Sequence, residues 1–132
     1  MADTSGPLVL YVEDEALVRE LGLAGLEEAG FAVEAVTSGS AAIMAIDGRE
    51  KAFRAIVTDI DLGGELSGWD VARYAREKLP DIPVVYVSGG SAHEWPSLGV
   101  PRSVMLAKPY ASAQLVVAVS TSMLPAEGRP PG

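Results

Sequence analysis

The stretch AIVTDIDL, residues Ala55–Leu62, begins like a buried strand and ends with two carboxylates. Its first four residues are apolar or β-branched, which is typical of a strand covered on both faces. Asp59 and Asp61 then appear two positions apart, and no lysine or arginine follows them before Arg73. Because a buried carboxylate is costly unless its charge is compensated, the stretch predicts that distant parts of the chain provide the compensation.

Four other apolar runs have strand composition, and segments of helical length separate them. The predicted strands are Leu8–Val12, Phe31–Val36, Ala55–Thr58, Pro83–Val87 and Ser103–Ala107. The predicted helices are Glu15–Ala29, Ser40–Ile46, Ser67–Leu79 and Ser112–Met123. This alternation predicts a doubly wound α/β domain with a five-stranded parallel sheet.

Local signals set the predicted helix ends and faces. In the first helix Leu17, Leu21 and Ala24 follow the i, i+4, i+7 spacing of one apolar face. Gly48 is predicted to end the second helix. The crossover GGSAHEWPSLGVP, residues Gly89–Pro101, contains three glycines and two prolines, so we expect a fourth helix of only one or two turns.

Composition limits the class of protein. At 132 residues with 48% hydrophobic and 21% charged residues, the chain predicts one globular domain over 1–124 and a flexible tail over 125–132. The net charge of -8 argues against nucleic acid and anionic membranes as partners. The chain lacks cysteine, a signal-peptide pattern and an apolar run of about 18 residues, so we expect a cytoplasmic protein.

Polar side chains follow four of the five predicted strands. They are Glu13 and Asp14 after the first strand, Asp59 and Asp61 after the third, Ser88 after the fourth and Lys108 after the fifth. The carboxyl ends of parallel strands share one edge of a sheet, where ligands bind in this class of fold. We therefore expect these side chains to converge.

Convergent carboxylates repel one another, and a hard cation such as Mg²⁺ relieves that repulsion. Lys108 would add a positive charge, and Ser88 a hydrogen-bond donor, for an anion bound beside the metal. An aspartate in such a site can attack phosphorus, since phosphoryl transfer needs mainly positioning and charge neutralisation.

The order of these residues resembles the receiver domain of two-component response regulators. The matching features are ED after the first strand, D after the third, S after the fourth and KP after the fifth, and they cover about Leu8–Met123. The loop DIDLGGELSGWD and the triplet KPY are also similar to stand-alone receivers common in alphaproteobacteria. The resemblance implies a flavodoxin-like sheet with strand order 2-1-3-4-5.

The resemblance also implies roles for the acids. Asp59 corresponds to the phospho-acceptor, which is also a metal ligand. Asp14 corresponds to a direct metal ligand, Glu13 to an acid that reaches the metal through water, and Asp61 to a position whose main-chain carbonyl binds it. Gly68 lies one residue further from the acceptor than in the commonest spacing, so we expect a longer and more mobile loop.

The resemblance also implies roles for the residues that follow the fourth and fifth predicted strands. Ser88 corresponds to the hydroxyl that turns toward the phosphoryl group, Lys108 to the lysine that pairs with it, and Pro109 to a cis peptide. Met105 stands where receivers often carry an aromatic switch residue, so an aromatic flip is not expected. Met105 and Tyr110 are the candidates for the output face.

The implied partners are a histidine kinase or phosphotransfer protein as the phosphoryl donor and a downstream protein as the target. Residues 111–126 contain no charged side chain. Because the outer side of a surface helix is usually charged, the last helix predicts a contact with a partner or a homodimer.

Two alternatives stay open. Asp59 and Asp61 form the DxD pattern of a haloacid-dehalogenase-like phosphatase, with one acid as nucleophile and the other as general acid, although the chain is short for such an enzyme. The third hypothesis is a pseudo-receiver that binds partners without phosphorylation, because Met105 and the longer loop depart from the receiver pattern.

Overall fold

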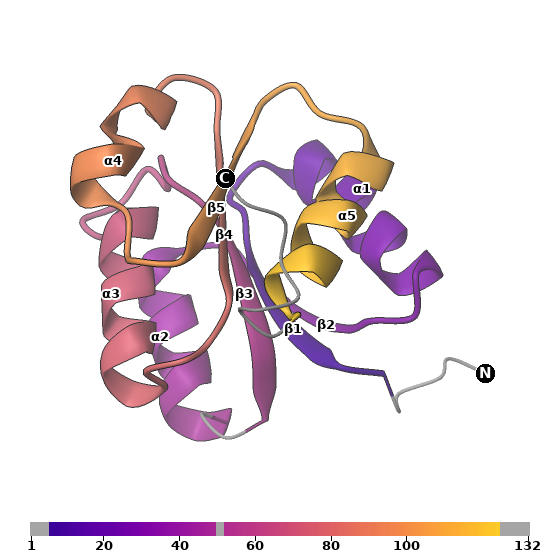
Figure 1. The fold of residues 1–132 in the computed structure, drawn as a ribbon, viewed down its shortest axis with the longest axis horizontal. Helices are drawn as coiled ribbons and strands as arrows, with labels where there is room; N and C mark the ends of the chain where they lie inside the picture. Colours follow the sequence, from indigo (N-terminus) through magenta and orange to yellow (C-terminus); the bar gives the residue numbers. More distant parts are fainter. Residues whose placement is uncertain (1–5, 50–51, 125–132) are drawn as a thin grey trace.

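The computed structural model describes residues 6–49 and 52–124, and within them five strands form one parallel sheet (Figure 1). The strands are β1 (Leu8–Val12), β2 (Ala32–Val36), β3 (Phe53–Asp59), β4 (Val84–Ser88) and β5 (Ser103–Ala107). Their order is β2-β1-β3-β4-β5, so the predicted topology is confirmed. The tail predicted over 125–132 lies outside the described residues.

Helices cover both faces of the sheet (Figure 1). They are α1 (Ala16–Glu28), α2 (Gly39–Arg49), α3 (Gly68–Lys78), α4 (Trp95–Leu98) and α5 (Ser112–Ser122), with a 3₁₀ turn η1 at Ala92–Glu94. The helices α1 and α5 pack on one face, and α2, α3 and the short α4 lie on the other. The predicted shortening of the fourth helix is confirmed.

The position of β1 inside the sheet, between β2 and β3, explains why its sequence is apolar without interruption. Val9 and Tyr11 belong to the core under α1 and α5, whereas Leu10 and Val12 belong to the core under α2 and α3. Successive side chains of a strand point to opposite faces, so a strand covered on both faces is apolar at every position. Because β1 and β3 are neighbouring parallel strands inside the sheet, their carboxyl ends lie side by side.

The predicted apolar face of α1 does not pack on the sheet. Leu17 is 67% exposed, Leu21 is 60% exposed, and Ala24 is exposed as well. The side of α1 that packs inward consists mainly of Gly22, Gly25 and Leu26. The i, i+4, i+7 pattern was correct as a helix signal but wrong as an indicator of the buried face.

The reason lies in the size of the Tyr11 side chain. A Cβ atom on Gly22 would lie 2.2 Å from the Tyr11 hydroxyl, which donates a hydrogen bond to the Val18 carbonyl at 3.3 Å. Glycine thus lets α1 sit directly against the tyrosine. A larger residue at position 22 would push the helix away from β1.

The second helix is longer than predicted. It continues through Gly48 to Arg49, because Gly48 lacks the positive φ of a helix-ending glycine. Arg49 donates a hydrogen bond to Glu34 on β2 at 2.8 Å, which ties the end of the helix to the sheet. Gly30, just after α1, does have a positive φ of 98° and ends that helix region.

Among the described residues, no helix has both the length and the apolar character needed to cross a bilayer.

Hydrogen bonds hold the short helix α4 against the edge of the sheet. Trp95 Nε1 donates to Ser103 Oγ at 2.8 Å, and the Val100 N–H donates to the Tyr86 hydroxyl at 3.0 Å. These bonds replace part of the packing that a longer helix would supply.

Candidate functional site

Three predicted acids meet at the carboxyl edge of the sheet. One carboxylate oxygen from each of Glu13, Asp14 and Asp59 lies within 4.8 Å of the other two. Glu13 and Asp59 are only 1% and 5% exposed, whereas Asp14 is exposed to solvent. The cluster therefore extends from the protein interior to the surface, as an accessible cation site requires.

Backbone contacts fix Glu13 between the sheet and α1. Its N–H donates to the Val36 carbonyl at 3.1 Å, which continues the β1–β2 ladder by one residue. Its carboxylate accepts the Glu15 N–H at 3.2 Å, and its carbonyl accepts from Arg19 at 3.0 Å. The first turn of α1 thus orients a buried carboxylate toward the site.

The backbone at the start of α3 lies very close to the backbone of Asp59. A Cβ atom on Gly68 would lie 2.2 Å from the Asp59 carbonyl oxygen, and the Gly68 N–H donates to the Ile60 carbonyl at 2.8 Å. Only glycine lets the start of α3 lie directly behind Asp59. Leu62 of the intervening loop is buried, so this longer loop is anchored to the core. Its greater mobility stays a prediction.

Lys108 joins the two buried acids. Its Nζ lies 3.1 Å from Asp59 Oδ2 and 3.2 Å from Glu13 Oε1. Burial by itself would lower the pKa of Lys108, but the hydrogen bond to Asp59 and the charges of both carboxylates outweigh this effect and raise it. Lys108 is therefore a fixed positive charge at physiological pH.

One lysine does not balance three carboxylates. Burial raises the pKa of Glu13 to about 6, with the charge of Asp59 acting in the same direction and Lys108 in the opposite one. A raised carboxylate pKa means that the negative form is destabilised where it stands. Oxygen ligands, excess negative charge and an open side all fit Mg²⁺, and Glu13, Asp14 and Asp59 could hold it.

Ser88 and Asp61 lie beside this cluster rather than within it. The Ser88 hydroxyl is buried and accepts the N–H groups of Gly90 and Ser91 at 3.2 and 2.7 Å. The Asp61 carboxylate is outside the three-acid cluster and accepts from the Ser91 hydroxyl at 3.3 Å. Nothing in this arrangement conflicts with a main-chain role for Asp61.

The resemblance drawn from the sequence agrees with comparisons to known proteins. The family model of the response regulator receiver domain matches residues 9–120. The chain belongs to this family. A response regulator receiver protein from Sinorhizobium medicae WSM419, solved by crystallography, is 44% identical, with 90% of this chain and 95% of that chain covered and a TM-score of 0.86.

Curated relatives of this receiver domain differ in length. The response regulator receiver protein CpdR of Brucella abortus is 29% identical over 120 residues, which cover 89% of this chain and 98% of the relative. A putative NtrX-like response regulator of Rickettsia typhi is 29% identical over 112 residues, but only 23% of its length is covered. Receiver domains belong to two-component systems, in which they interact with histidine kinases and downstream partners.

The receiver places the two output candidates on opposite faces of its sheet. Met105 packs against the core under α2 and α3, whereas Tyr110 packs against the core under α1 and α5. Lys108 is followed by a cis peptide to Pro109, as expected. That Met105 and Tyr110 form the output face stays a prediction.

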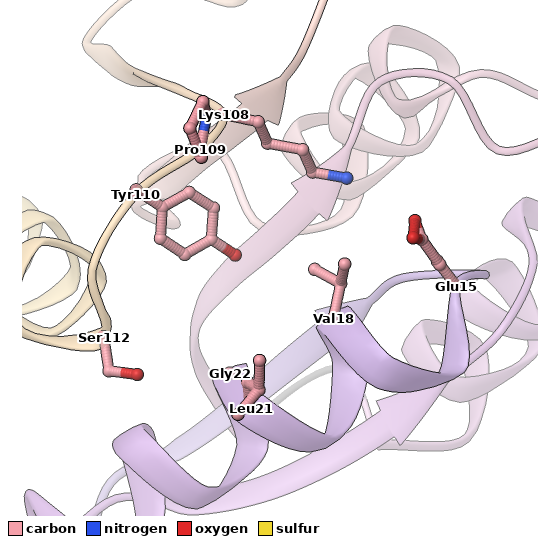
Figure 2. Close-up of a pocket in the computed structure, with 8 residues that line it drawn as sticks. All are labelled: Glu15, Val18, Leu21, Gly22, Lys108, Pro109, Tyr110 and Ser112. Atoms are coloured by element: carbon pink, nitrogen blue, oxygen red, sulfur yellow. The ribbon is translucent and has the colours of Figure 1, made fainter.

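Tyr110 lines a groove that sequence reasoning missed. This groove has a volume of about 470 Å³ and separates α1 from the β5–α5 loop (Figure 2). Its lining residues are Glu15, Val18, Leu21, Gly22, Lys108, Pro109, Tyr110 and Ser112. The aliphatic part of Lys108 borders the groove while its Nζ reaches Asp59, so the groove adjoins the acceptor site. The sequence placed Leu17 and Leu21 on one face of the helix but did not show that this face is exposed.

Proposed function

We propose that this receiver accepts a phosphoryl group on Asp59 in a Mg²⁺-dependent phosphorelay and signals through protein contacts. The observation that carries the proposal is the pairing of Asp59 Oδ2 with Lys108, inside a cluster of acids that could hold the cation. The domain is taken to extend over 1–124, with 125–132 as a tail. A bound Mg²⁺ would neutralise negative charge on the transferring phosphoryl oxygens.

Each residue of the site has a separate role in phosphoryl transfer. Lys108 holds one oxygen of Asp59, so the other oxygen attacks phosphorus. The new bond is O–P and the broken bond is the P–N bond of a phosphohistidine, whose imidazole leaves. Lys108 then pairs with a phosphoryl oxygen, and the Ser88 hydroxyl donates to another. Glu13, Asp14 and Asp59 would hold the cation when it is bound, with the Asp61 carbonyl as a further ligand.

The exposed face of α1 suits the donor protein. Leu17 and Leu21 lie on the helix that borders the groove beside Lys108, so a protein bound there is next to Asp59. Exposed acids surround these leucines: Glu15, Glu20, Glu27 and Glu28. A partner with an apolar centre and a lysine- or arginine-rich rim is complementary to this surface. The histidine kinase or phosphotransfer protein is the occupant that the proposed reaction requires.

The output contact, with a second copy or a downstream protein, is expected on a different surface from the donor contact on α1. The helix α5 has no charged residue, and Val117 on it is 63% exposed. In a chain with net charge -8, two copies can approach at this helix without repulsion between like charges. A homodimer through α5 therefore stays a prediction, which light scattering before and after phosphorylation tests. A downstream protein would compete for the same face.

The alternatives have weaker support. A haloacid-dehalogenase-like phosphatase needs Asp61 as a general acid near the scissile bond, but its carboxylate contacts Ser91 instead. A pseudo-receiver has no use for a lysine held between two buried acids. Partners other than proteins, a membrane or nucleic acid, are not expected, and neither is steady turnover of a substrate.

Incubation with acetyl phosphate and Mg²⁺, followed by intact mass spectrometry, tests the proposal. The wild type should gain one phosphoryl group and Asp59→Asn none, while Asp61→Asn should still be labelled. Continuous hydrolysis of phosphate esters, abolished by Asp61→Asn, would support the phosphatase. Absence of labelling in the wild type would support the pseudo-receiver.

A further inference from the structure

A chain of hydrogen bonds passes through Ser91, a residue without a predicted role, and reaches both Ser88 and Asp61. The Ser91 N–H donates to Ser88 Oγ at 2.7 Å, and Ser91 Oγ donates to the Asp61 carboxylate at 3.3 Å to either oxygen. Ser91 thus connects the loop after β4 to the loop after β3. The two loops that flank Asp59 are tied by one side chain.

We propose that Ser91 is a positioning residue that couples the Ser88 hydroxyl to the Asp61 carboxylate and stabilises the unphosphorylated arrangement of both loops. The inference rests on the proposed phosphorylation of Asp59. It adds a regulatory contact that requires both a hydroxyl at position 91 and a carboxylate at position 61.

The Ser88 hydroxyl is the first link. It is buried and accepts two N–H groups of its own loop, from Gly90 and Ser91. Turning toward a phosphoryl group on Asp59 moves this oxygen away from both donors. The Ser91 N–H then loses its acceptor, so the loop has to rearrange or leave a backbone donor unpaired.

The Asp61 carboxylate is the second link. Its contact with Ser91 holds it toward the β4–α4 loop and outside the cluster of Glu13, Asp14 and Asp59. Movement of Ser91 away from its present place breaks this contact as well. The unphosphorylated state therefore keeps two interactions at Ser91 that the phosphorylated state loses.

A contact present in only one of two states shifts the population between them. Ser91→Ala removes the hydroxyl link and should favour the arrangement in which Ser88 reaches Asp59. A hydrogen bond between partly exposed groups changes an equilibrium by about two- to fivefold. The initial rate of Asp59 labelling by acetyl phosphate and Mg²⁺ should rise by this factor.

The test is a double-mutant cycle on that rate, with Ser91→Ala, Asp61→Ala and the double variant. We expect each single variant to be faster than the wild type and Ser91→Ala to add nothing in the Asp61→Ala background. Ser91→Thr keeps a hydroxyl and should restore the wild-type rate. Ser97→Ala is the matched control, because Ser97 is an exposed serine whose hydroxyl donates to the Glu94 carbonyl and, among the described residues, has no hydrogen bond with Ser88 or Asp61.

Amide hydrogen exchange of metal-free protein gives a readout that needs no phosphorylation. The Ser91 amide should exchange about two- to fivefold faster in Asp61→Ala than in the wild type and should be unchanged in Ser97→Ala. Independent, multiplying effects of the two substitutions, or an unchanged Ser91 amide, would overturn the coupling. If the wild type is not labelled at all, the proposed function fails, and the exchange result alone decides whether Ser91 couples the loops.

Discussion

The segment from Glu13 to Leu21 contains two opposite departures from the usual burial of side chains. Glu13 is 1% exposed although it is a carboxylate, whereas Leu17 and Leu21 are 67% and 60% exposed although they are apolar. Burying a charge and exposing a leucine both raise the free energy of an isolated domain. Each departure becomes understandable if something binds there.

The comparison indicates what binds at each place. At Glu13 the neighbours are two other carboxylates and one lysine, so the missing component is positive and small. At Leu17 and Leu21 the neighbours are an apolar groove and exposed acids, which fit the protein partner proposed above. Cation and donor protein would thus meet Asp59 from adjacent directions.

The largest effect is expected inside α1 itself, where two leucines differ only in burial. Leu26 is fully buried under the helix and Leu21 is exposed. Leu26→Ala should lower the free energy of unfolding by about 3 kcal/mol, because it leaves a cavity in the core. Leu21→Ala should change it by less than about 0.5 kcal/mol. Urea unfolding measures both, and equal losses would contradict the orientation of α1.

The face of α1 also marks the limit of what the sequence predicted. All five strands and the convergence of Glu13, Asp14, Asp59 and Lys108 followed from strand composition and the order of polar residues. Apolar periodicity shows which residues share a face of a helix. It does not show that a glycine face packs inward when a strand presents a tyrosine.

Two further features depended on contacts that no local pattern contains. The sharing of Lys108 between Glu13 and Asp59 depends on the relative height of three strand ends. The separation of Met105 from Tyr110 depends on where β5 ends and the chain crosses to the α5 side. Both are tertiary consequences of loop lengths and register.

The second prediction concerns transfer from a protein donor. Leu17→Ala combined with Leu21→Ala should slow phosphotransfer by about tenfold, which corresponds to about 1.4 kcal/mol of lost contact. Labelling by acetyl phosphate should stay unchanged, because this small donor does not contact α1. The measurement uses autophosphorylated histidine kinases of the organism that encodes the chain, taking the kinase that phosphorylates the wild type fastest.

Met44→Ala provides the matched control, because Met44 is a large exposed apolar residue on α2. It should leave both reactions unchanged. Equal transfer to the wild type and the double variant would exclude α1 as the docking surface. Normal labelling by acetyl phosphate without transfer from any kinase would exclude a kinase as the occupant.

The third prediction addresses the buried acid. The pKa of Glu13 is raised to about 6, above the ordinary value near 4.5, so the folded state holds this proton more tightly than the unfolded state. The Glu13 contribution to the free energy of unfolding should therefore fall as the pH rises from about 4.5 to 7, by about 1–2 kcal/mol in metal-free protein.

Glu13→Gln removes this titration and should raise the free energy of unfolding at pH 7 by a similar amount of about 1–2 kcal/mol. Urea unfolding between pH 4.5 and 7.5 in a chelating buffer compares the two proteins. Parallel curves would show that burial of Glu13 carries no electrostatic cost. The same variant should bind Mg²⁺ more weakly, since it loses a negative charge from the cluster.

The most direct test of the cation site is the effect of Mg²⁺ on unfolding at pH 7. Mg²⁺ should raise the free energy of unfolding of the wild type, as any ligand of the folded state does. Asp81→Asn, at an acid whose side chain is 93% exposed, should respond equally, and Asp14→Asn should respond little or not at all. An equal response of all three proteins, or none in the wild type, would contradict a cation site built from Glu13, Asp14 and Asp59.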